Sequence, residues 1–78
     1  MEGELQKIVG TNLRLLRQQR GTSQEKLAEE LGVHRTYMGS LERGERNLSL
    51  RSVERLAKSL GVEPLELLTG PAVLLDES

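Results

Sequence analysis

The chain has 78 residues, which suffice for one small domain with a modest hydrophobic core. It contains no cysteine, so disulfide bonds and thiolate metal sites are excluded. It has neither an apolar run near the roughly 18 residues of a membrane-spanning helix nor a signal peptide, so we expect a cytoplasmic protein without a membrane partner. A core this small gives limited stability alone, which favours association with a second copy.

The charge of the chain is unevenly distributed. The formal net charge of −1 argues against a nucleic-acid partner at first sight. Residues 11–51 nevertheless hold eight basic and five acidic residues, whereas residues 52–78 hold two basic and five acidic ones. The basic part of the chain therefore remains compatible with binding to DNA.

The first predicted helix covers residues 4–20 and ends at Gly21. Its expected buried stripe has apolar residues three or four positions apart, namely Leu5, Ile8 or Val9, Leu13 and Leu16. Gly10 lowers the helix propensity by roughly 1 kcal/mol, so a break before Thr11 is an alternative.

Residues 24–43 predict two short helices joined by a tight turn. Ser23 can cap the first helix, and Gly32 can end it in the left-handed conformation. The buried faces are expected to carry Leu27, Ala28, Leu31, Met38 and Leu41. Arg35, Thr36 and Ser40 are then expected on the outer face of the second helix, with Tyr37 beside them, where polar side chains suit the base edges of a major groove.

Two further helices are predicted after a turn at residues 44–47. Ser49 can cap the first of them, whose apolar face comprises Leu50, Val53, Leu56, Ala57 and Leu60. Pro64 suits the first position of a short last helix that reaches Thr69 and is ended by Gly70 and Pro71. We therefore expect one domain over residues 1–70 and a C-terminal tail over residues 71–78.

The residues that most enzymes need are missing. His34 is the only histidine, and at the expected cap position of the second short helix it is more consistent with capping or a phosphate contact than with catalysis. Neither a phosphate-cradling glycine loop nor a nucleophile with a nearby base is present. We expect no enzyme activity, catalytic residue, cofactor or metal, and no effector pocket in so short a chain.

Residues 24–43 resemble the helix-turn-helix of the phage-repressor and Cro-like (XRE) family of small bacterial regulators. The resemblance rests on Gln24, Ala28, Gly32, Met38 and Leu41, and it extends from Leu13 to about Leu68. The run from Arg35 to Asn47 is most similar to the controller proteins of restriction-modification systems. The resemblance implies an all-α, five-helix domain whose recognition helix spans about residues 35–43.

The resemblance also implies roles for individual residues. Base contacts are expected from Arg35, Thr36, Ser40, Tyr37 and Arg46, and phosphate contacts from Gln24, Arg43, Asn47, Arg51 and His34. Arg35 suits bidentate contact with a guanine, Arg46 is open to either role, and Tyr37 is open to core packing instead. Arg17 and Glu42 match an ion pair of phage repressors, and direct contact of either with DNA is the alternative.

The expected assembly is a homodimer on an inverted-repeat operator in double-stranded DNA. Leu65, Leu67 and Leu68 cannot all face inward on one short helix, so they are the expected dimer interface.

The expected function is that of a transcriptional regulator that activates and then represses its own promoter. RNA polymerase is the expected partner of acidic residues such as Glu25, Glu29 and Glu45. A phage-type repressor, an antitoxin and, less favoured, a protein-binding adaptor are the alternatives.

Overall fold

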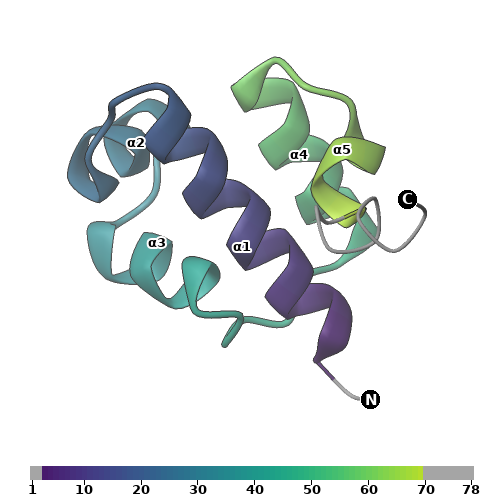
Figure 1. Ribbon diagram of the computed structural model, residues 1–78. Helices are drawn as coiled ribbons and strands as arrows, with labels where there is room; N and C mark the ends of the chain where they lie inside the picture. The colour runs from purple at the N-terminus through teal and green to yellow at the C-terminus, as the bar shows by residue number, and fades with distance from the viewer. Residues whose placement is uncertain (1–2, 70–78) are drawn as a thin grey trace.

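Five α-helices succeed one another in the computed structural model, which describes residues 3–69. They are α1 (Glu4–Gln19), α2 (Gln24–Leu31), α3 (Arg35–Glu42), α4 (Leu50–Leu60) and α5 (Pro64–Leu68). Helix α1 runs through the middle, with α2 and α3 on one side and α4 and α5 on the other (Figure 1). The described residues include no strand, and the predicted all-α architecture is confirmed.

The helix ends follow local sequence signals. The hydroxyl oxygens of Ser23 and Ser49 accept the backbone N–H groups of Lys26 and Ser52, each at 3.1 Å, as expected of N-caps. Gly32 ends α2 in the left-handed region with φ of 72°, which a side chain would disfavour. The alternative of a break before Thr11 does not occur, because α1 continues through Gly10 without interruption, as the predicted single helix requires.

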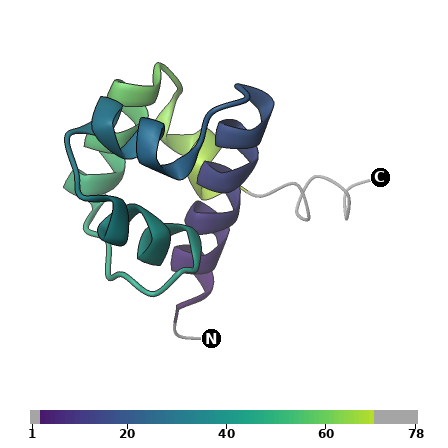
Figure 2. The same ribbon diagram turned by 90° about the vertical axis from the view of Figure 1, so that its left-hand side faces the viewer.

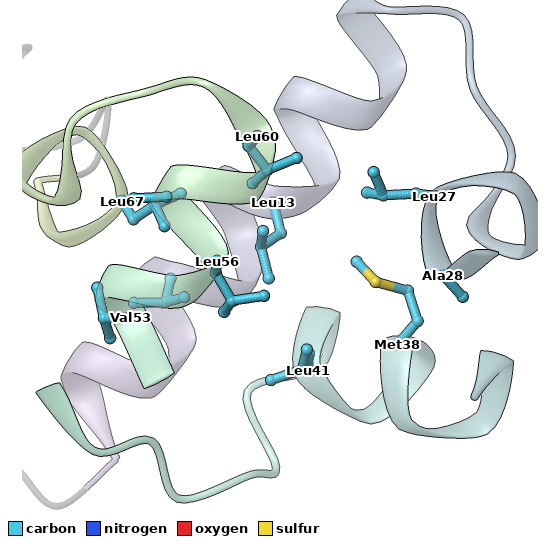
Figure 3. Close-up of a cluster of buried hydrophobic side chains, with 11 residues drawn as sticks. Leu13, Leu27, Ala28, Met38, Leu41, Val53, Leu56, Leu60 and Leu67 are labelled. Carbon is cyan, nitrogen blue, oxygen red and sulfur yellow. The ribbon is translucent and has the colours of Figure 1, made fainter. Parts of the chain in front are cut away.

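All five helices contribute to a single core. The buried side chains are Val9 and Leu13 of α1, Leu27 and Ala28 of α2, Met38 and Leu41 of α3, Val53, Leu56, Ala57 and Leu60 of α4, and Leu67 of α5. Figure 3 shows the labelled members converging from helices far apart in the sequence. Burial of these side chains is the main force that holds the helices together.

The exposure of three leucines differs from the prediction. The apolar spacing predicts Leu5 and Leu50 in the core, but they are 60% and 77% exposed. The prediction of Leu67 in the dimer interface is wrong, because this side chain is fully buried. The reason is that α5 packs against both α1 and α4 and turns Leu67 inward, whereas Leu65 remains 69% exposed.

Two polar side chains, one in α1 and one at its C-cap, bond to the ends of the last two helices. The buried amide of Asn12 donates to the backbone oxygens of Glu66, Leu67 and Thr69 at 3.2, 2.8 and 3.2 Å. The guanidinium of Arg20 donates to the backbone oxygen of Leu60 at 2.6 Å. These bonds satisfy carbonyl groups that a helix end leaves without an intrahelical partner.

No helix among residues 3–69 is long and apolar enough to cross a membrane. The predicted C-terminal tail, residues 71–78, lies outside the described part of the chain.

Candidate nucleic-acid interface

The turn between α2 and α3 is held by backbone and side-chain hydrogen bonds. The N–H of Val33 donates to the backbone oxygen of Ala28 at 2.9 Å. The Nδ1 atom of His34 accepts the N–H of Thr36 at 3.1 Å and so caps α3. Since a doubly protonated imidazole has no acceptor nitrogen, this cap requires His34 with a free Nδ1.

The start of α3 presents two side chains to the exterior. Arg35 and Thr36 are exposed, and neither side chain forms a hydrogen bond or ion pair with another residue in the range 3–69. Figure 2 views the molecule from the side of α2 and α3. These side chains are therefore available for contact with an external molecule, as the sequence predicted.

Ser40 does not lie on this outer face. It is only 8% exposed, so the prediction that places it beside Arg35 and Thr36 is wrong. Its hydroxyl donates to the backbone oxygen of Tyr37 at 2.8 Å and accepts from Nε of Arg46 at 2.9 Å. The segment after α3 folds back over this part of the helix, and Ser40 thereby fixes a side chain rather than facing a base.

Arg46 lies over the ring of Tyr37. Its guanidinium carbon is 4.9 Å from the ring centroid, within the range of a cation–π interaction. Tyr37 is half-buried and also packs against the core, so its ring is held from both sides. Together with the bond to Ser40, this stacking orients Arg46 beside α3 while leaving the arginine exposed.

Arg17 and Glu42 form the ion pair that the resemblance implied. Nε and Nη2 of Arg17 donate to the two carboxylate oxygens of Glu42 at 2.7 and 3.1 Å, and Nη1 donates to the backbone oxygen of Thr22 at 3.1 Å. The carboxylate is 4% exposed, and its hydrogen bonds and charge raise the pKa of Arg17 above the ordinary value. This bidentate ion pair links α1 to the end of α3.

The residues predicted to bind phosphate are distributed around α3 and the segment that follows it. Gln24 donates to Oε1 of Glu42 at 2.9 Å, so part of its amide is already engaged. Arg43 pairs with Glu45 at 3.1 Å on the surface, and Asn47 accepts a hydrogen bond from Gln6 of α1. Arg51 is exposed on the first turn of α4.

Sequence reasoning missed two polar residues that join the first helix to the ends of α4 and α5. These residues are Asn12 and Arg20. The sequence indicated Asn12 only through its place beside the apolar stripe of α1, next to Leu13, and it gave no indication of the bond made by Arg20. Within residues 3–69 no group of three or more metal-ligating side chains comes together.

Comparison with known proteins identifies close relatives of this chain. The family model described as Helix-turn-helix matches residues 13–67. The chain is 44% identical over 69 residues to the control protein C.BamHI of Bacillus amyloliquefaciens. This match covers 87% of this chain and 85% of that protein. The crystal structure of the hypothetical transcription factor NHTF from Neisseria superposes with a TM-score of 0.82 and 37% identity, covering 100% of this chain and 90% of that one. The restriction-modification controller protein C.AhdI from Aeromonas hydrophila gives a TM-score of 0.69 and 47% identity over 80% of this chain and 94% of that one.

Proposed function

Because the chain belongs to the helix-turn-helix family of DNA-binding transcriptional regulators, we propose that it is the controller protein of a restriction-modification system and regulates its own promoter. The observation that carries the proposal is its likeness to control proteins across most of both chains. The exposed start of α3, beside an arginine held in a fixed orientation, is consistent with reading DNA.

In this proposal α3 enters the major groove. Arg35 contacts a guanine through O6 and N7, and Thr36 contacts a thymine methyl group or a phosphate. Arg46 reaches the same groove from its place over Tyr37, while Ser40 supports Arg46 without touching a base. Contacts to the phosphates on either side of the groove come from Gln24, Arg43, Asn47, Arg51 and His34.

The dimer forms through an apolar surface patch made of Leu5, Leu50, Leu65 and Leu68. Leu5, Leu50 and Leu65 are 60%, 77% and 69% exposed, which is more than any other large apolar residue in the range 3–69. Leu5, Leu50 and Leu68 also line a small apolar hollow of about 70 Å³ that a partner side chain can fill. Two-fold symmetry then places two recognition helices about 34 Å apart, facing an inverted repeat.

Regulation follows from occupation of successive operators as the concentration of the dimer rises. The first dimer recruits RNA polymerase through an acidic surface, and a second dimer excludes it. Glu29 and Glu45 approach cations of their own chain, at 4.0 and 3.1 Å, which leaves Glu25 as the stronger candidate for the polymerase contact.

The test is a reporter fused to the chain's own promoter, with the protein supplied from an independent inducible source. Reporter output is expected to rise at low protein concentration and to fall at high concentration. The variant Glu25→Gln is expected to lose the rise and to keep the fall. Repression from the lowest dose onward would contradict the controller role and favour a phage-type repressor.

A further inference from the structure

A surface hollow of about 380 Å³ lies between the α2–α3 turn and α4. Its volume is within the range of sites that bind small molecules. The lining residues come from both sides of the hollow: Leu31, Gly32, Val33 and Tyr37 on one, and Ser52, Arg55, Leu56, Lys58 and Ser59 on the other. None of the DNA contacts or dimer contacts proposed above uses the α4 side of this hollow.

The chemistry of the hollow is apolar on the inside and cationic at the edge. Leu31, Val33 and Tyr37 are half-buried and pack against the core, so they form a fixed apolar wall. Arg55 and Lys58 are exposed, and neither forms an ion pair with another residue of the described chain. No acidic residue lines the hollow, so a bound anion would meet two cations without a competing carboxylate in the lining.

We propose that this hollow binds a small organic acid, in which an apolar body contacts Leu31, Val33 and Tyr37 and a carboxylate contacts Arg55 and Lys58. Ser52 and Ser59 add hydroxyl donors beside the cations. The apolar wall distinguishes this site from a surface that attracts any anion, because inorganic phosphate gains nothing from it. The site does not depend on the proposed controller role, because Arg55 and Lys58 contact no DNA in that proposal; the two share only Tyr37, whose ring also supports Arg46.

The test is an NMR titration of the full chain labelled with ¹⁵N, using 3-phenylpropionate as the probe and 3-phenylpropionamide as its neutral match. Saturable shifts of the Gly32, Val33 and Ser59 amide signals are expected with the acid at about millimolar concentration, the range typical of so small a ligand. The neutral amide and inorganic phosphate are each expected to bind at least tenfold more weakly. The double variant Arg55→Ala/Lys58→Ala should lose the difference between acid and amide, because both side chains are exposed and their removal leaves the core intact.

Arg14→Ala provides the matched control, since it removes an exposed arginine from α1, away from the hollow. This variant should bind 3-phenylpropionate like the parent chain. Equal binding of the acid and its amide, or unaltered acid binding by the double variant, would overturn the proposal. Binding of an acidic peptide at these amides in the absence of 3-phenylpropionate binding would instead assign the hollow to a protein partner and overturn it as well.

Discussion

Gly10 of α1 lies so close to Glu42 of α3 that a Cβ atom on the glycine would come within 2.7 Å of the Glu42 carbonyl oxygen. The backbone oxygen of Leu41 would be nearer still. Both neighbours belong to the helix backbone and cannot move aside like the end of a flexible side chain. The absence of a side chain at position 10 therefore allows α1 and α3 to cross closely and fixes the position of α3.

Gly10→Ala is expected to lower the free energy of unfolding by about 2 kcal/mol, because the added methyl group must push the two helices apart. Helix propensity alone predicts the opposite sign, a gain of up to about 1 kcal/mol. Urea denaturation followed by circular dichroism measures the difference. Gly39→Ala is the matched control within α3, since its nearest neighbour is the end of the Arg43 side chain at 3.3 Å, and it should follow helix propensity with a gain of up to about 1 kcal/mol. Stabilisation by Gly10→Ala would contradict the close crossing.

Arg17→Met is expected to destabilise the protein by about 3 kcal/mol, because it leaves the buried Glu42 carboxylate without its cation. Glu42 then retains the amide of Gln24 as its remaining side-chain partner. The double variant Arg17→Met/Glu42→Leu should be more stable than Arg17→Met alone, since it removes the uncompensated charge. A double-mutant cycle from urea denaturation gives the coupling energy, and additive effects would show that the ion pair contributes nothing of its own.

Asn12→Ala is expected to cost about 1 to 3 kcal/mol, because three backbone oxygens at the end of α5 lose their side-chain donor. Asn12→Asp keeps the shape but directs a carboxylate at those oxygens, so it should destabilise the protein more than alanine does. Thermal unfolding of the three proteins at neutral pH provides the order. An aspartate variant as stable as the parent would contradict the assigned hydrogen bonds.

Leu65→Glu is expected to shift the protein towards monomer while the fold is retained, because Leu65 is exposed in the proposed dimer patch. Leu67→Ala should instead lower the free energy of unfolding by about 2 to 5 kcal/mol, because Leu67 is fully buried. Sedimentation velocity and urea denaturation separate the two effects. A parent chain that is monomeric at micromolar concentration would contradict the dimer.

Local features of this fold were predictable because they depend on nearby residues. Serine caps at positions 23 and 49 and the left-handed glycine at position 32 involve partners within a few positions. The apolar spacing of α2 and α3 likewise predicted the burial of Met38 and Leu41.

Features that depend on contacts between helices escaped the sequence analysis. Helix propensity alone predicts that Gly10 weakens α1, but in the fold its missing side chain lets α3 approach α1 closely. Ser40 has the spacing of an outer residue, but the chain after α3 returns over it and brings Arg46 to its hydroxyl. The hollow between the α2–α3 turn and α4 was not predicted either, because its lining joins residues more than twenty positions apart in the sequence, from Leu31 to Ser52.

The most direct measurement of the central claim compares operator DNA and scrambled DNA in gel-shift titrations of the parent chain and of Arg35→Ala. The operator is first obtained by selection from random DNA. Loss of Arg35 should weaken operator binding by about 1 to 3 kcal/mol and change binding to scrambled DNA little, because a base contact is lost while phosphate contacts remain. Equal weakening on both DNAs would contradict base reading by α3 and would make Arg35 a phosphate contact.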